Sequence, residues 1–270
     1  MKQLTINHST IKFLDVGTGP AVLLVHGFPL DHSMWRNQIA PLSAHHRVIC
    51  PDLPGFGASR SAGRLFSLRQ WVEDLIGLMD SLEIETVTFC GLSMGGYIGW
   101  QFWKYHPDRL TKLVACNTRA GADNETMVRA RHISAQAARE NGIGNLANDM
   151  ISKMFAAVNL PTQAEAVELV RSMIAGIEPE SVALGQLAMA ERPDATSWLA
   201  EIQIPTLFVA GQFDSITPVA EMQANGALLP GSHFCVIPDA GHLTPLENPH
   251  IFNSILQAFL QGRRHDLITG

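Results

Sequence analysis

Six short apolar runs, each followed by a glycine, a proline or a polar residue, constrain the fold of this chain more than any other feature. Runs without polar alternation indicate strands that are buried on both faces, which is typical of parallel sheets. Segments with helical periodicity lie between these runs. The chain is therefore predicted to be an α/β protein with a doubly wound, mostly parallel sheet. The six runs are 21–25, 48–50, 86–90, 110–116, 206–210 and 233–237.

The segments around these runs carry helix and hairpin signals. Residues 3–8 and 10–16 read as two short strands that form a hairpin. A capping box at Ser67 predicts the start of a helix. A second helix is predicted over 94–105, and the last one has Pro249 at its first position.

The region from about 122 to 195 contains no strand run, and its periodicity predicts an all-helical insert. We expect this insert to leave from the carboxyl end of the strand at 110–116, where open α/β sheets bind ligands, and to act as a lid. The predicted core is then 1–121 and 196–270, and the lid is 122–195. Its four helices are expected at roughly 124–141, 144–156, 162–176 and 179–191.

Composition excludes several classes of protein. A chain of 270 residues with 46% hydrophobic and 16% charged residues can bury a large core. Its net charge of −6 and the lack of a concentrated basic patch argue against nucleic-acid binding. No stretch is long and apolar enough to span a bilayer, and the first residues lack the apolar region of a signal peptide.

Cysteines supply no metal or disulfide pattern. The four lie at or near the ends of apolar runs, so buried free thiols are expected. A chain of this kind fits the reducing cytoplasm. The sequence predicts neither a metal nor a cofactor, and it leaves the oligomeric state open. The cysteines are Cys50, Cys90, Cys116 and Cys235.

The strongest chemical signal is the G-x-S-x-G pattern at Gly91, Ser93 and Gly95, which joins the strand at 86–90 to a helix. On such a turn, side chains at either glycine would collide with backbone, and the serine backbone is strained so that its hydroxyl is exposed. The helix N-terminus directs free N–H groups to the same place. This context predicts that Ser93 is a nucleophile.

A serine nucleophile needs a base that a third group orients. His242 follows the strand at 233–237, and Asp214 follows the strand at 206–210, so both loops reach the same sheet edge. The order Ser, Asp, His along the chain is the one expected for this arrangement. The sequence therefore predicts a triad of Ser93, His242 and Asp214.

Other readings of these residues exist. Taken singly, His242 is also compatible with a hydrogen-bonded loop residue, and Asp214 with a helix cap ahead of Pro218. Asp239 is too close in sequence to His242 to orient its ring from a separate strand. Asp52 precedes the nucleophile and breaks the expected order.

An oxyanion hole is expected from two backbone N–H groups. One is that of Met94, directly after the nucleophile, and the other is that of Phe28, in the loop after the strand at 21–25. Gly27 allows this loop to turn its N–H inward. We expect His26 to hold the loop by a hydrogen bond to backbone.

Five segments together resemble α/β-hydrolase-fold enzymes over nearly the whole chain. They are HGFPLDHSMW (26–35), DLPGFGAS (52–59), GLSMGG (91–96), GQFDSITP (211–218) and DAGHLTPLENP (239–249). Similar sequences include carboxylesterases, enol-lactonases of the 3-oxoadipate type, carbon–carbon bond hydrolases and cofactor-free perhydrolases. Ser93 stands at the turn where haloalkane dehalogenases and epoxide hydrolases, which are similar elsewhere, have an aspartate. Phe28 stands where HGGG-type lipases have a second glycine.

The leading hypothesis is a carboxylesterase that cleaves small esters through an acyl-enzyme. An enol-lactonase or a carbon–carbon bond hydrolase is the alternative within the enzymes. A non-catalytic binding protein on the same fold is the alternative from another class. The partner is expected to be a small-molecule ester, and its identity, chain length and stereochemistry are left open.

Side chains that shape the substrate are predicted only in outline. Met127, Met154 and Phe155 of the insert are candidates for an apolar acyl pocket, although packing of the insert helices on the core explains most such residues. Arg119 follows the strand at 110–116 and is a candidate ligand for a substrate carboxylate. A structural ion pair between Arg119 and the lid is the favoured reading.

Overall fold

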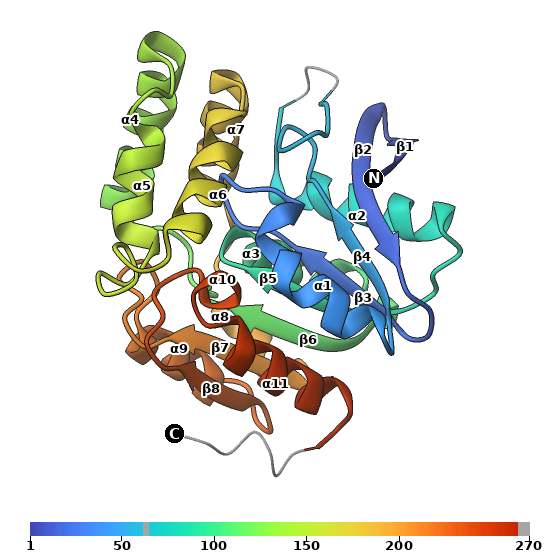
Figure 1. Cartoon of the computed structure of the whole chain (residues 1–270). Helices are drawn as coiled ribbons and strands as arrows, with labels where there is room; N and C mark the ends of the chain where they lie inside the picture. The colour runs from blue at the N-terminus through green and yellow to red at the C-terminus, as the bar shows by residue number, and fades with distance from the viewer. Residues whose placement is uncertain (62–64, 264–270) are drawn as a thin grey trace.

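A computed structural model describes residues 1–61 and 65–263, so residues 62–64 and 264–270 of the predicted core lie outside the described part. The chain forms an eight-stranded sheet (Figure 1) in the order β1-β2-β4-β3-β5-β6-β7-β8. The pairs β1–β2 and β2–β4 are antiparallel, and every pair from β4 to β8 is parallel. The predicted sheet is thus confirmed. The strands are β1 (Lys2–Ile6), β2 (Ser9–Val16), β3 (Ala21–Val25), β4 (Arg47–Pro51), β5 (Val87–Leu92), β6 (Leu110–Cys116), β7 (Thr206–Gly211) and β8 (His233–Ile237).

Helices cover both faces of this sheet. The Ser67 cap is confirmed, because its hydroxyl accepts from Gln70 N at 3.0 Å. The sequence pattern does not predict the helices at 36–43 and 219–227, and the first of them contains Pro41, an unfavourable residue inside a helix. The α-helices are α1 (Arg36–Ser43), α2 (Leu68–Ser81), α3 (Met94–Tyr105), α4 (Glu125–Asn141), α5 (Leu146–Met154), α6 (Ala164–Ala175), α7 (Pro179–Ala190), α8 (Thr196–Leu199), α9 (Val219–Ala227), α10 (Thr244–Glu247) and α11 (Pro249–Leu260).

Alternation along the buried strands divides the core into two layers. In β3, Leu23 and Val25 pack with α2 and α3, whereas Val22 and Leu24 pack with α1 and α11 on the other face. All four side chains are almost fully buried. The continuous apolar runs of the sequence therefore arise because both faces of the sheet are covered.

The strand order places a topological switch point between β3 and β5. After β3 the chain adds β4 on one side, and it then crosses to add β5 on the other. At such a point the loops that follow the two strands diverge and leave a crevice, which is where open α/β sheets bind ligands. The two loops at this point carry Phe28 and Ser93.

Helices α4 to α7 form an all-helical segment between β6 and β7, and they stand together beyond the sheet (Figure 1). Helix α5 ends at Met154, earlier than the sequence predicts, because Phe155 turns to an extended conformation. Helix α7 approaches the loop after β3 closely, since a Cβ on Gly185 would lie 2.9 Å from the Phe28 ring. We call residues 122–195 the insert. Its function as a lid remains a prediction.

The two ends of the insert are tied together at one place. Ala195 N donates to Ala120 O at 2.9 Å, so the chain leaves the core and returns to it at neighbouring positions. Just inside this point the fully buried carboxylate of Asp123 pairs with Arg192 at 2.7 Å and also with Arg131. The Asp123 carboxylate is thereby neutralised by two guanidinium groups, which burial of a charge requires.

The cysteines match their prediction as buried free thiols. Cys90 and Cys116 lie on the neighbouring strands β5 and β6, with their sulfur atoms 3.9 Å apart. Burial raises the pKa of Cys235 to about 11 and raises the pKa of Cys50 as well. Among the described residues, no helix combines the length and apolarity that crossing a membrane needs.

Candidate active site

Ser93 occupies the strained turn that the sequence predicts. Its φ of 53° and ψ of −112° lie outside the usual regions for a residue with a side chain, and α3 begins at the next residue. A Cβ on Gly91 would lie 2.3 Å from Gly95 O, and a Cβ on Gly95 would lie 2.4 Å from Val25 O. Both glycines are therefore required by backbone packing, as predicted, and this packing maintains the strain at Ser93.

Replacement of Gly95 by alanine is expected to lower the free energy of unfolding by about 3 kcal/mol, because the new methyl group meets backbone that cannot rotate away. Urea unfolding followed by circular dichroism measures this change. Gly144→Ala is the matched control, since a Cβ there meets nothing within 4 Å. Equal effects of the two substitutions would contradict the steric explanation.

Asp214 and His242 form a buried pair at the carboxyl ends of β7 and β8. His242 Nδ1 donates to Asp214 Oδ2 at 2.8 Å, and the side chains are 2% and 0% exposed, respectively. The backbone N–H groups of Ile216 and Thr217 bind the other carboxylate oxygen at 2.8 and 3.0 Å. The pairing fixes the Nδ1–H tautomer of His242 and directs its other ring nitrogen away from the acid.

The environment of Asp214 keeps it ionised. Burial alone would raise its pKa, but the charge and hydrogen bond of His242 and the hydrogen bonds from Thr217 and Asn117 outweigh burial. Together these groups hold the pKa of Asp214 well below its ordinary range. The carboxylate is therefore ready to stabilise a positive charge on the neighbouring imidazole.

The residues after β6 connect this pair to Ser93. Asn117 Nδ2 donates to Asp214 Oδ2 at 2.8 Å, and Thr118 Oγ1 donates to Ser93 O at 2.7 Å. Ser93 N donates to Cys116 O at 2.9 Å. Within the described part of the chain, no hydrogen bond joins the Ser93 hydroxyl to His242. Hydrogen bonds of this kind are often long before substrate binds.

Sequence reasoning misses two partners of Asp214. Asn117 has a positive φ of 45° and is fully buried, and its side chain also accepts from Thr244 at 2.7 Å. Thr217 donates its hydroxyl to Asp214 Oδ2 at 2.5 Å. The position of Asn117, directly after a buried strand, is the only signal in the sequence that could have indicated its role.

Asp52, another acid weighed in the sequence as a partner of the predicted catalytic histidine, binds different residues. Its Oδ1 lies 2.6 Å from His32 Nδ1, and its Oδ2 accepts from Ala58 N at 2.8 Å. Burial opposes charge on both groups, yet their mutual hydrogen bond and attraction raise the pKa of His32 and lower that of Asp52. Asp31, His32 and Asp52 together are three side chains of the types that bind metal ions. Both oxygens of Asp52 already accept hydrogen bonds within the protein, so the pair of His32 and Asp52 fits a structural ion pair.

Two backbone N–H groups are the predicted oxyanion donors. Met94 is the first residue of α3, so its N–H has no partner inside the helix. Phe28 lies in the loop after β3, and its ring is buried against Phe56. His26 holds this loop as expected: its Nε2 accepts from Leu53 N at 3.0 Å and its Nδ1 donates to Gly27 O at 2.9 Å.

Arg119 is engaged within the protein. Its Nε lies 3.1 Å from Glu221 of α9, its guanidinium donates to Ile216 O, and Met127 Sδ lies 3.7 Å from Nη1. The predicted ion pair is thus present, but the acid belongs to the core and not to the insert. Among the described residues, Met127 is the insert residue whose contact with Arg119 the structure shows.

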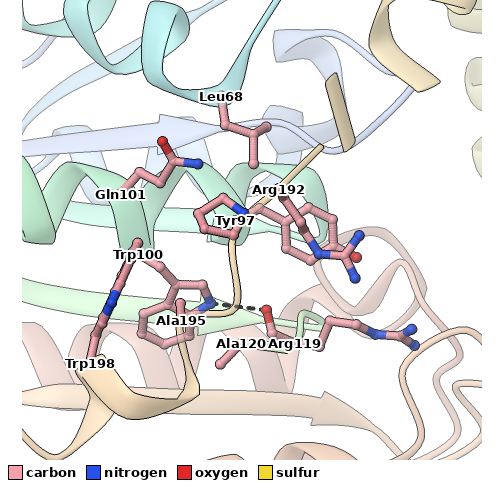
Figure 2. A pocket seen from close by; sticks show the side chains of 10 residues that line it. Leu68, Tyr97, Trp100, Gln101, Arg119, Ala120, Arg192, Ala195 and Trp198 are labelled. Atoms are coloured by element: carbon pink, nitrogen blue, oxygen red, sulfur yellow. Dashed lines mark hydrogen bonds between the residues drawn. The ribbon is translucent and has the colours of Figure 1, made fainter. Parts of the chain in front are cut away.

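The other predicted substrate residues are parts of the insert packing. Met154 and Phe155 are 1% and 3% exposed and join the apolar cluster that contains Leu243. A small cavity near the ends of the insert (Figure 2) is lined by Tyr97, Trp100, Arg119 and Arg192 among others, and it does not include Ser93 or His242. In it, the Arg192 guanidinium stacks on the Tyr97 ring at 4.4 Å.

Comparison with known proteins places this fold in a family. Residues 20–249 match the family model described as alpha/beta hydrolase fold. The chain is 31% identical over 260 residues to 3-oxoadipate enol-lactonase 2 of Acinetobacter baylyi, covering 96% of this chain and 94% of the relative.

Solved structures agree with this placement. A thermophilic esterase from Thermogutta terrifontis is 39% identical with a TM-score of 0.93, covering 97% of this chain and 98% of that one. The enol-lactonase from Burkholderia xenovorans LB400 is 27% identical with a TM-score of 0.90, covering 96% and 100%, respectively. These relatives support a hydrolase activity, and the chain belongs to the alpha/beta hydrolase fold family.

Proposed function

We propose that this protein is a carboxylic ester hydrolase that uses Ser93 as nucleophile, His242 as general base and Asp214 as the group that orients the base. The observation that carries the proposal is the buried 2.8 Å hydrogen bond between His242 and Asp214 at the sheet edge that also bears the strained Ser93. The acid on Nδ1 leaves the unprotonated Nε2 of His242 to accept the proton of a serine hydroxyl.

The reaction proceeds in two halves. Ser93 Oγ bonds to the ester carbonyl carbon while His242 Nε2 takes the hydroxyl proton. The bond from that carbon to the alcohol oxygen then breaks, and His242 returns the proton to the leaving alcohol. Water, deprotonated by the same nitrogen, attacks the acyl-enzyme and releases the acid and the free serine. Asp214 stays ionised throughout and stabilises the imidazolium.

Charge on the carbonyl oxygen would be stabilised by the N–H groups of Met94 and Phe28. Donors fixed before the reaction lower the barrier without the cost of reorganisation, and one such donor contributes about 3 kcal/mol. The buried Phe28 ring and the hydrogen bonds of His26 hold one donor, and the start of α3 holds the other.

An enol-lactonase is the second candidate, because a relative of that name matches nearly the full length of the chain. A lactone is an internal ester, so the same triad would open it without losing a separate alcohol. In an enzyme for dicarboxylate substrates a free cation is expected near the site. Arg119 is already paired with Glu221, which favours a neutral ester over an anionic lactone.

A panel of substrates tests these proposals. We expect hydrolysis of short p-nitrophenyl esters such as the butyrate, and covalent labelling of Ser93 by a fluorophosphonate located by mass spectrometry. The panel includes an enol-lactone, a dicarboxylate half-ester and a dienone ring-cleavage product. Faster turnover of the lactone or half-ester, lost in Arg119→Ala, would select the lactonase, and preference for the dienone would select a carbon–carbon bond hydrolase. No labelling and no turnover would indicate a binding protein.

A further inference from the structure

Glu247 is a buried carboxylate that no step of the proposed reaction uses. It is 5% exposed and lies at the end of α10, shortly after His242. Its Oε1 accepts from Gly241 N at 2.9 Å and from Leu243 N at 3.0 Å. One oxygen therefore holds the backbone on both sides of the predicted catalytic histidine.

The other oxygen of Glu247 binds the insert. Oε2 accepts from Ala156 N at 2.7 Å and from Asn159 Nδ2 at 2.8 Å, both in the segment that follows α5. The same segment reaches the histidine directly, because His242 N donates to Met154 O at 2.7 Å. The contact is close-packed, since a Cβ on Gly241 would lie 2.5 Å from Ala156 N.

All four partners of Glu247 are N–H donors. Among the residues that the structure describes, Glu247 forms no ion pair, so these donors alone satisfy it. Two donors face each oxygen, an arrangement that only a carboxylate can accept in full. A glutamine would direct its own N–H groups against two donors whichever way its amide is turned. The site is thus specific for an acid and sensitive to an isosteric change.

We propose that Glu247 is a positioning residue that fixes the backbone of His242 and makes insert residues 154–159 part of the support for the catalytic base. This inference rests on the proposed function for its kinetic consequence. On this proposal, this part of the insert stays docked during turnover. Any opening that admits substrate must then come from other parts of the insert.

Glu247→Gln is expected to lower kcat on p-nitrophenyl butyrate about ten- to a hundred-fold, because small displacements of a catalytic group have effects of this size. KM is expected to stay within about threefold, since the substrate contacts are unchanged. Hydrogen exchange measured by mass spectrometry should become faster in peptides that cover 154–159 and 241–243 together. Faster exchange confined to these two segments separates the loss of this link from a general loss of stability, which would speed exchange throughout the core.

Asp15→Asn is the matched control. Asp15 is also a largely buried carboxylate, with Arg47 at 2.9 Å and Lys2 at 2.7 Å, but it lies on β2 at the antiparallel side of the sheet. We expect lower thermal stability in this variant with kcat unchanged. If Glu247→Gln behaves in the same way, with normal exchange in both segments, the positioning role is refuted.

A second variant decides the question if Glu247→Gln does not fold. Asn159→Ala keeps the carboxylate and removes one donor on the insert side, and we expect kcat to fall more than about threefold with faster exchange at 241–243. Unchanged kcat and exchange would refute the proposal. If the wild-type protein neither hydrolyses esters nor reacts with a fluorophosphonate, the proposed function fails, while the exchange data still decide the link between Glu247, the insert and His242.

Discussion

Replacement of Ser93 by alanine is expected to reduce kcat for ester hydrolysis at least about a thousand-fold, because the acyl-enzyme can no longer form. The fold should be retained, since alanine has the same Cβ at this strained position. Steady-state kinetics on p-nitrophenyl butyrate and the loss of fluorophosphonate labelling measure the effect. The remaining activity would come from binding and the oxyanion donors alone.

Ser81→Ala is the control for this experiment. Ser81 lies at the exposed end of α2, where its hydroxyl donates to Gly77 O at 2.8 Å. Its substitution should leave kcat and labelling unchanged. Wild-type activity in Ser93→Ala would show that another nucleophile, or no covalent step, is responsible for hydrolysis.

Asp214→Asn is expected to reduce kcat by about 10⁴-fold while the protein stays folded. An asparagine amide can donate to His242 Nδ1, which favours the tautomer that carries its proton on Nε2. The nitrogen that should accept the serine proton is then already protonated. Loss of the carboxylate also removes the charge that stabilises the imidazolium. Kinetics at several pH values, together with circular dichroism, separate this effect from unfolding.

Asp239→Asn is the matched control, because Asp239 is an acid only three residues from His242 and its side chain is exposed. We expect near wild-type turnover in that variant. A large loss in Asp239→Asn with little change in Asp214→Asn would mean that the buried pair is structural and that a different acid serves the histidine.

The sheet and the positions of the candidate site residues at its edge could be predicted because local sequence determines them. A parallel strand buried on both faces leaves a continuous apolar run such as 21–25, and a nucleophile turn leaves glycines at 91 and 95. Asp214 and His242 are recognisable as candidates since each lies within five residues of the end of such a run. These signals lie within a few residues of the feature they specify.

Other features depend on partners that are distant in the chain, and no local pattern records them. Asn117 approaches Asp214 only because β6 and β7 are neighbours in the sheet. From the sequence, Arg119 is a candidate to pair with the insert or with a substrate carboxylate. In the structure it pairs with Glu221, which lies on α9, a helix that the sequence pattern does not predict. Glu247 carries no separate signal in the sequence, and its contacts become visible only when the fold brings Ala156 to it.

The hydrogen bond between Ala195 and Ala120 joins the two points at which the chain leaves the core and returns to it, so the insert is a segment that could be exchanged as a unit. Because the chain leaves and re-enters the core at neighbouring positions, we expect that a segment of different length or helix number could replace 122–195 without changing the strand order. On the proposed function, such an exchange would alter the residues that surround the substrate while Ser93, Asp214 and His242 stay in the core. One contact limits which segments could replace the insert. A new segment must bring N–H donors to the Glu247 carboxylate, because otherwise the buried acid is left without hydrogen-bond partners.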